Sequence, residues 1–334
     1  MTGGTLATWP NGAAYWQRLG QTLMDVILHL GAHRTATTTF QHYIRDHVEQ
    51  LGTQDVAFWG PQRSRKSVFP GLFRNSVARK GCNVAKRAEG RIRMFATQAQ
   101  ARGIRQLLIS DENLLGTCVH NLRHKRLYPA AGERGARISA AFGGRVRRIV
   151  LSIRSQELWW ASACALTVSR GHPVPTAQTC EAISLNRRTW RDVITDLACA
   201  APGAEIEVMP FEMHAGRPEP MLCAALGRDV PTDTRRRWLN RSEDLQTLRA
   251  RLAEQGGDPD LLPDAVGRWQ PFSPEQATRL AENYADDLHW LSAGADGLAK
   301  LTEDARPIRA DTSLTPGAMT KGQGYDKGQL AQHR

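Results

Sequence analysis

The stretch VILHLGAHRTATTTF, residues 26–40, decides the fold of this chain. It opens with an apolar run, Val26–Leu30, of the kind found in strands that are buried on both faces. A polar loop follows, and from Phe40 to Leu51 apolar residues recur at helical spacing. A loop between a strand and a helix turns backbone N–H groups and the positive end of the helix toward one point. The stretch therefore predicts a phosphate-binding strand–loop–helix unit.

Similar apolar runs recur along the chain and predict further strands. They occupy residues 107–110, 149–153 and 206–209, with a weaker run at 56–59. Helical patterns separate them, and one begins at Ser273–Gln276, a capping box with Pro at the first helical position. This alternation predicts an α/β fold, a doubly wound and mostly parallel sheet flanked by helices. In such a sheet, ligands bind at the carboxyl ends of the strands.

The length and composition predict one large domain, which we place at residues 24–304. Residues 1–23 lack a clear period and predict an N-terminal extension, whereas residues 305–334 are polar and Gly-rich, which predicts disorder. No apolar run approaches the roughly 20 residues that span a membrane. The six cysteines lack Cys-x-x-Cys spacing, which indicates reduced thiols. We therefore expect a cytoplasmic protein without a membrane span.

The charge of the chain favours an anionic partner. Lys and Arg total 44 against 33 Asp and Glu, a net charge of +11. Such an excess suits a phosphorylated nucleotide or an acidic polymer. Charge alone does not choose between these partners, so the choice depends on the motifs.

The loop after the first strand differs from that of ATP- and GTP-binding proteins, which read Gly-x-x-x-x-Gly-Lys-Ser/Thr. Here Gly31 is followed five positions later by Ala36, and Thr37 stands where Lys is required. The basic residue of the loop, Arg34, lies in its middle instead. Hydroxyl donors come from Thr35, Thr37, Thr38 and Thr39. The loop is typical of phosphate binding but argues against an ordinary kinase or nucleotide hydrolase.

A second candidate phosphate site follows the strand at residues 149–153. Arg154 ends that strand, and Ser162 lies eight positions later on the helix expected to begin near Ser155. Ser162 then lies about two turns along the helix, on the same side as its start. A guanidinium and a hydroxyl in this arrangement can hold one phosphate together.

Together, the loop His33–Thr38 and the pair Arg154 and Ser162 resemble the phosphate sites of sulfotransferases, in their bacterial and carbohydrate-type forms. The resemblance spans roughly residues 24–295. It implies a P-loop-like sulfotransferase fold with 3′-phosphoadenylyl sulfate (PAPS) as cosubstrate and no metal. It also implies a hydroxyl or amine acceptor, with a saccharide among the candidates.

The resemblance also assigns roles to residues. It implies that Arg34 binds the 5′-phosphosulfate and stabilises the leaving phosphate, that Arg154 and Ser162 bind the 3′-phosphate, and that Arg241 covers it. The donor loop would be completed by Thr35, Ala36, Thr37, Thr38 and Thr39. Two positions depart from the family pattern, because Arg34 replaces a Lys and Ala36 replaces a Gly.

The candidate base follows the strand at residues 107–110. Sulfotransferases use a His or a Glu as the base, and this strand ends in Asp111-Glu112-Asn113. We predict Glu112 as the base, with Asp111 as the alternative and His33 in the loop as a possible assistant. The competing interpretation of Glu112 is an acid that stabilises a helix N-terminus.

Several other patterns have a structural interpretation. Trp159 and Trp160 are typical of a core rather than an acceptor pocket, and Glu212 is interpreted as structural. A run of basic residues predicts an exposed helix face, with a rim that attracts an acidic acceptor as the alternative. The run contains Arg74, Arg79, Lys80, Lys86, Arg87, Arg91 and Arg93.

Two rival functions stay open. A small-molecule kinase or other P-loop nucleotide-binding protein would need a phosphate-loop Lys and an acid for Mg²⁺, a role open to Asp111. A non-catalytic basic protein would bind an acidic polymer through its charge alone. We find no nucleic-acid-binding motif and so expect no nucleic-acid partner.

Overall fold

The computed structural model describes residues 23–73, 83–230, 239 and 241–302. The expected disordered tail, residues 305–334, lies outside these ranges, as does the expected N-terminal extension except for Leu23. Among the described residues, no helix combines the length and the apolar character that crossing a bilayer requires.

Within the described ranges, six strands form one all-parallel sheet in the order β2-β3-β1-β4-β5-β6. The strands are β1 (Asp25–His29), β2 (Val56–Trp59), β3 (Gln106–Ser110), β4 (Val146–Ile153), β5 (Glu205–Pro210) and β6 (Lys300–Leu301). Because β1 lies between β3 and β4, the chain builds the sheet first on one side of β1 and then on the other. This reversal places a crevice at the carboxyl end of β1.

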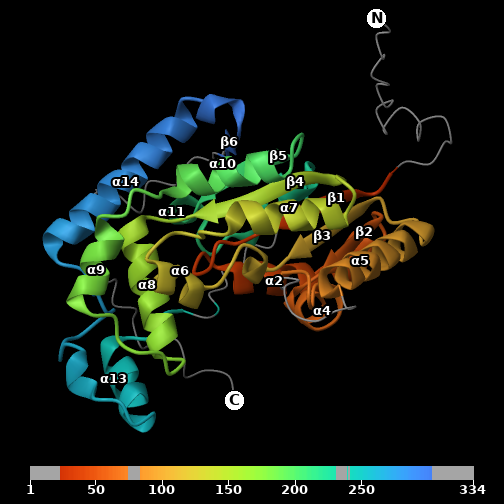
Figure 1. Ribbon diagram of the computed structural model, residues 1–334. Helices are drawn as coiled ribbons and strands as arrows, with labels where there is room; N and C mark the ends of the chain where they lie inside the picture. Colours follow the sequence, from red (N-terminus) through yellow and green to blue (C-terminus); the bar gives the residue numbers. More distant parts are fainter. Residues whose placement is uncertain (1–22, 74–82, 231–238, 240, 303–334) are drawn as a thin grey trace, which may run out of the picture.

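The helices lie between the strands and on both faces of the sheet (Figure 1). In chain order they are α2 (Thr37–Asp46), α3 (Val48–Gly52), α4 (Pro61–Arg63), α5 (Val84–Ala101), α6 (Cys118–His124), α7 (Ala131–Ala141), α8 (Gln156–Val168), α9 (Ala177–Ser184), α10 (Trp190–Ala200), α11 (Phe211–His214), α12 (Pro218–Leu226), α13 (Leu245–Glu254) and α14 (Pro274–Ser292), with the π-helical turn η1 (Ser64–Val68) and the 3-10 turns η2 (Glu112–Leu114), η3 (Pro259–Leu261) and η4 (Ala295–Gly297).

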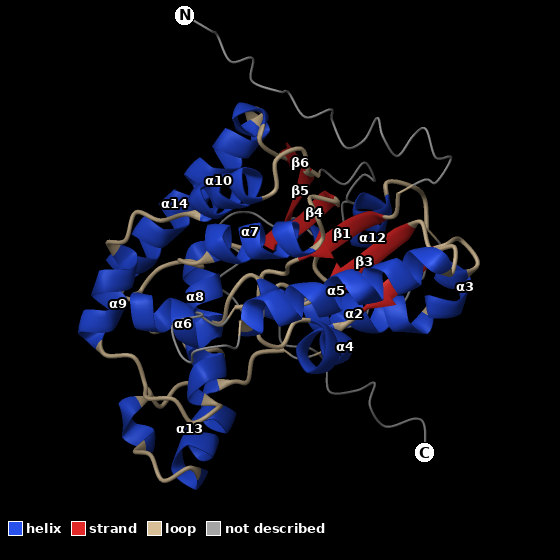
Figure 2. Ribbon diagram, turned by 45° about the vertical axis from the view of Figure 1, so that its right-hand side comes forward, coloured by secondary structure: helices blue, strands red, loops and turns tan. Residues whose placement is uncertain are grey.

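Two apolar cores hold these layers together. The larger core packs α5, α7, α10 and α14 against one face of the sheet, and the smaller packs α2 and α12 against the other (Figures 1 and 2). A third, separate core joins the end of α8 to α13 and the segment 262–269. The prediction of an α/β fold with a parallel sheet between helices is confirmed.

The strands match the apolar runs of the sequence, including the weak run at β2. The strand β6 was not predicted, because two residues are too few to show a hydrophobic pattern in the sequence. The helix expected from Phe40 to Leu51 is wrong in detail. It begins earlier, at Thr37, and His47, with φ −113° and ψ 13°, separates α2 from α3. The predicted capping box is confirmed, since Ser273 accepts a hydrogen bond from the backbone N–H of Gln276.

Candidate functional site

The loop after β1 continues to pair with β4 before it turns into α2. The backbone N–H of Leu30 donates to the Val150 carbonyl at 3.1 Å, and that of Ala32 donates to the Ser152 carbonyl at 2.9 Å. The loop then curls through left-handed residues, with φ 63° at Arg34 and 61° at Ala36. Ala36 holds the N-cap position of α2 without a side-chain cap. A ligand at the start of α2 therefore meets no competing side-chain cap from Ala36.

A pocket of about 200 Å³ opens beside this loop. Its wall combines the start of α2, the ends of β4 and β5 and two later segments. The lining residues are Arg34, Ala36, Thr37, Thr38, Arg154, Phe211, Leu239, Arg241, Ser242 and Arg268. Four of these described residues are arginines and none is a carboxylate. Such a wall favours an anion, because helix N-termini and guanidinium groups both stabilise negative charge.

Arg34 projects across the pocket toward two serines. Its Nε donates to Ser162 Oγ and its Nη2 to Ser242 Oγ, each at 2.8 Å. The two hydroxyls lie 2.7 Å apart, so these three side chains form a closed triangle. Burial lowers the pKa of Arg34, and its side chain forms no ion pair with a carboxylate among the residues that the structure describes. The structure thus brings together Arg34 and Ser162, which the sequence assigned to opposite ends of the nucleotide.

Arg154 reaches the same pocket from the end of β4. Its Nη1 donates to the backbone carbonyl of Arg34 at 3.1 Å, and its guanidinium lies 4.8 Å from the ring centre of Phe211. The residue is only 9% exposed, and its Nε has no hydrogen-bond partner. Burial lowers the pKa of Arg154 to about 10, which still leaves it charged at neutral pH. A buried, charged N–H donor without a partner is available to hydrogen-bond an anionic ligand.

The start of α8 is held beneath the pocket by Glu212. This carboxylate accepts from the backbone N–H of Ser155 at 3.0 Å and from the Tyr284 hydroxyl at 2.8 Å. It also stabilises the charge of Arg154. Glu212 therefore fixes the α8 N-terminus, in agreement with its structural interpretation.

The late segment near Arg241 closes one side of the pocket. Arg241 and Ser242 both line it, and the backbone N–H of Leu239 donates to Thr39 Oγ1 at 3.2 Å. Thr39 thus anchors this segment and does not line the pocket. The neighbouring Arg235–Arg237, Trp238 and Asn240 lie outside the described residues.

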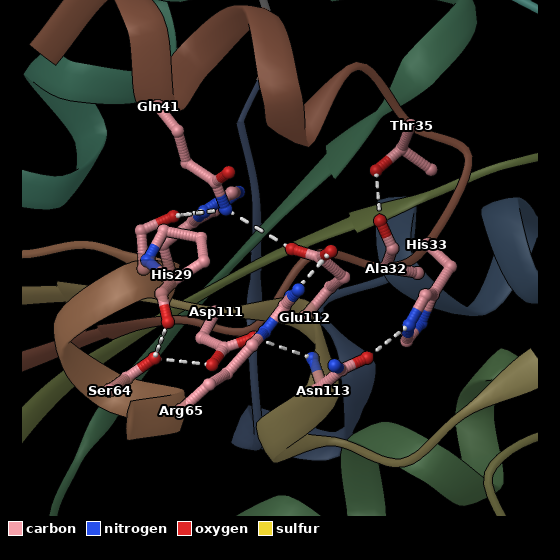
Figure 3. Close-up of polar contacts among 12 residues, drawn as sticks. His29, Ala32, His33, Thr35, Gln41, Ser64, Arg65, Asp111, Glu112 and Asn113 are labelled. Carbon is pink, nitrogen blue, oxygen red and sulfur yellow. Dashed lines mark hydrogen bonds and ion pairs between the residues drawn. The ribbon is translucent and has the colours of Figure 1, made fainter. Parts of the chain in front are cut away.

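The loop threonines divide into two groups. Thr37 and Thr38 line the pocket, as expected of ligand donors. The Thr35 hydroxyl instead donates to the Ala32 carbonyl at 2.8 Å and is buried inside the loop (Figure 3). Its hydroxyl therefore shapes the loop, and only its backbone stays available to a ligand.

The candidate bases lie in a second cluster at the end of β3 (Figure 3). Asp111 is buried, and it accepts from Ser64, from the backbone N–H of Asn113 and from Nε and Nη2 of Arg65, the last at 3.0 and 2.7 Å. These donors surround the carboxylate and tie it to η1. Asp111 therefore stabilises the turn after β3, and the structure disfavours it as a base.

Glu112 is held at both oxygens. Its Oε1 accepts from Arg65 Nη2 at 2.8 Å and its Oε2 from Gln41 Nε2 at 3.1 Å, and its side chain is 17% exposed. Burial by itself would raise the pKa of Glu112, but the charges and hydrogen-bond donors around it, Arg65 among them, outweigh burial and lower it. Glu112 is therefore ionised at neutral pH and remains reachable from solvent.

His33 has no free lone pair with which to assist. Its Nε2 donates to Asn113 Oδ1 at 3.0 Å, so its Nδ1 accepts from the Tyr128 hydroxyl at 2.8 Å. Burial lowers the pKa of His33, which keeps the ring neutral. The backbone carbonyl of His33 also accepts from Trp159 Nε1 at 2.7 Å, and Trp159 is fully buried. His33 and Trp159 thus fix the loop, and the suggestion that His33 assists catalysis is not supported.

The two clusters lie on opposite sides of the loop. Arg154 and Phe211 follow β4 and β5, whereas Glu112 and Arg65 follow β3 and β2. Glu112 does not line the arginine pocket, but it meets the loop at Gly31, where an added Cβ would lie 2.8 Å from Glu112 Cβ. The site is thus divided into an anion pocket on the β4–β5 side and an acid cluster on the β3–β2 side.

Sequence reasoning missed several residues of both clusters. Phe211, Ser242 and Arg268 line the pocket, and Gln41 and Arg65 hold Glu112. Ser242 directly follows Arg241, and Phe211 directly precedes Glu212, so both adjoin residues that the sequence singled out. Arg268 belongs to a loop without any motif and gives no signal in the sequence.

Compared with known proteins, the chain matches no family model, no curated protein and no solved structure. The functional argument therefore depends on the geometry of the two clusters.

Proposed function

We propose that this protein transfers a sulfuryl group from PAPS to a hydroxyl acceptor. The observation that carries the proposal is that Arg34 and Arg154, which follow two neighbouring strands, line one pocket without a carboxylate among its described lining residues. A bisphosphorylated adenosine offers one anionic group to each strand end. This pairing is the reason for preferring PAPS to a ligand with a single phosphate.

The pocket residues suit the two phosphates of such a ligand. In this proposal the N–H groups at the start of α2, with Thr37 and Thr38, bind the 5′-phosphosulfate. Arg154 Nε and Arg241 bind the 3′-phosphate, and Ser162 contributes through its hydrogen bond to Arg34. A phosphate oxygen at Arg154 Nε would satisfy a donor that is buried without a partner.

The acid cluster suits the acceptor. PAPS supplies a sulfuryl group that leaves the 5′-phosphate oxygen as the acceptor oxygen bonds to sulfur. Glu112, ionised and partly exposed, accepts a hydrogen bond from the acceptor hydroxyl and takes its proton. Because its pKa is lowered, Glu112 is a weak base that orients the hydroxyl and receives the proton late. Arg34 places positive charge where the leaving phosphate develops negative charge.

A kinase reaction fits these residues less well. Thr37 stands where a nucleotide-binding loop needs Lys. Asp111, the acid available for Mg²⁺ at a strand end, is surrounded by Ser64, Arg65 and the backbone N–H of Asn113. Metal binding there would have to break these contacts.

Calorimetry with adenosine 3′,5′-bisphosphate, the product nucleotide, tests the proposal. We expect it to bind at least tenfold more tightly than ATP with Mg²⁺. Arg34→Ala and Arg154→Ala should each weaken binding about tenfold or more, since each removes a charged hydrogen bond to phosphate. Arg187→Ala removes an exposed arginine between α9 and α10 and serves as the matched control. Wild-type affinity in both pocket variants, or a preference for ATP, would contradict the proposal.

A further inference from the structure

A basic surface adjoins the acid cluster at one end of the molecule. We call it the η1–α5 face and define it by the exposed residues Arg63, Arg65, Lys66, Lys86, Arg87 and Arg93. The face spans α4, η1 and α5, and the helices α4 and α5 lie side by side in both views (Figures 1 and 2). Its described acidic residue Glu89 is paired with Arg93 at 3.3 Å, which leaves the face strongly positive.

The two parts of this face are packed together. The Arg63 guanidinium lies 4.8 Å from the ring centre of Trp59 and 5.6 Å from that of Phe95 on α5. Arg91 on α5 donates from Nε to the Val68 carbonyl of η1 at 3.1 Å. In the basic run, Lys86, Arg87 and Arg93 are exposed, as predicted, whereas Arg91 is half-buried against η1 and joins the two parts. The members Arg74, Arg79 and Lys80 lie outside the described residues.

Arg65 connects this face to the candidate base. A guanidinium has five N–H donors, and the bonds of Arg65 to Asp111 and Glu112 use Nε and Nη2. Both N–H groups of Nη1 are without a partner among the residues that the structure describes, and the side chain is 41% exposed. Asp111 already holds the Arg65 guanidinium in place. Binding of an anion to Nη1 therefore costs little side-chain conformational entropy.

From this juxtaposition we infer that the acceptor is an acidic polysaccharide that lies along the η1–α5 face. This inference rests on the proposed function, because it gives a substrate class to the same site. A sugar acid carries a hydroxyl and a carboxylate on one ring. The sugar hydroxyl binds Glu112 while the sugar carboxylate binds Arg65 Nη1. Glu112 and Arg65 are themselves in contact, because Arg65 Nη2 donates to Glu112 Oε1 at 2.8 Å. Further carboxylates along the chain then face Lys66, Lys86 and Arg87.

Other acceptor classes fit this face less well. A nucleic acid would favour exposed aromatic rings for base stacking, and the exposed described residues of this face include none. An amine acceptor would place its positive charge beside Arg65 and Lys66.

Binding of a fluorescent hexagalacturonate and of its methyl ester tests the inference, with adenosine 3′,5′-bisphosphate saturating. The two probes share every hydroxyl and differ in charge. We expect the acid to bind the wild-type protein at least tenfold more tightly at low ionic strength, with a preference that shrinks as salt is added. The double variant Lys86→Gln/Arg87→Gln should weaken binding of the acid about threefold to tenfold and leave the ester unchanged. Arg65→Gln should weaken binding of the acid more than that of the ester, since it removes the charged donor for the carboxylate as well as a contact that holds Glu112.

The controls separate this surface from general charge effects. Arg187→Gln removes one exposed positive charge from the loop between α9 and α10, outside the η1–α5 face, and should bind both probes like the wild type. Lys86 and Arg87 are exposed, so their double variant folds even where Arg65→Gln is destabilised. Equal binding of acid and ester, equal losses in the control, or tighter binding of single-stranded DNA than of the acid would overturn the inference. Failure of the bisphosphate to bind would instead remove the proposed function, since acid binding is also measured without nucleotide.

Discussion

Arg154 donates from Nη1 to the backbone carbonyl of Arg34 at 3.1 Å, although 120 residues separate the two in the sequence. This contact joins the end of β4 to the loop after β1. It also leaves Arg154 Nε buried without a partner in the anion pocket. A charged donor kept in this state destabilises the free protein and is available to a ligand.

The substitution Arg154→Met should therefore separate stability from binding. Methionine fills a similar space without a buried charge, and we expect the free protein to gain about 1 kcal/mol of unfolding free energy. The rise in melting temperature on addition of adenosine 3′,5′-bisphosphate should disappear in this variant. A less stable variant that keeps its response to the nucleotide would refute this account of Arg154.

Gly31 is expected to tolerate no side chain. It has φ 91°, and a Cβ would lie 2.8 Å from Glu112 Cβ. Gly103 offers a matched control, with φ 84° and no atom within 4 Å of an added Cβ. In urea denaturation, Gly31→Ala should cost about 1–3 kcal/mol more than Gly103→Ala, because only Gly31 adds a clash to the backbone strain. Equal costs would show that Glu112 moves away freely.

His29 should make stability depend on pH. Burial lowers its pKa from 6.5 to about 4, with a smaller opposing effect from Glu112. Between these values the unfolded chain binds a proton that the native protein does not, so the stability from this residue falls as pH drops from 6.5 toward 4. The full loss is about 3 kcal/mol.

The variant His29→Gln isolates this effect. We expect the difference in unfolding free energy between wild type and variant to change by about 3 kcal/mol across that range, measured by urea denaturation at several pH values. A difference that stays constant with pH would mean that His29 takes up its proton over the same pH range in the native protein as in the unfolded chain.

Glu112 and Asp111 should respond differently to loss of charge. Glu112→Gln is expected to bind adenosine 3′,5′-bisphosphate like the wild type and to lose about 100-fold or more in sulfuryl transfer. Asp111→Asn should instead lose about 1–3 kcal/mol of stability, because it removes the carboxylate that the buried Ser64 hydroxyl and the half-exposed Arg65 share. Turnover with labelled donor and thermal denaturation measure the two effects. Unchanged turnover in Glu112→Gln would eliminate this residue as the base.

The sequence by itself determined the sheet, the loop and the candidate phosphate residues. A strand such as the one at Val26–Leu30 is indicated by a short run of neighbouring apolar residues, so the strands could be predicted from local sequence. The pairing of Arg34 with Arg154 also followed, because the carboxyl ends of parallel strands meet at one edge of the sheet.

Tertiary structure alone decided which partners these residues meet. Ser242 reaches Arg34 across 208 residues, and Arg65 reaches Glu112 across 47. No local period encodes such contacts, since they depend on how separately formed elements pack. The same packing brings the Tyr128 hydroxyl to Nδ1 of His33, where it donates a hydrogen bond, and surrounds Asp111 with donors. Burial and long-range hydrogen bonds are thus the reason for proposing Glu112 among three candidates that the sequence placed near one another.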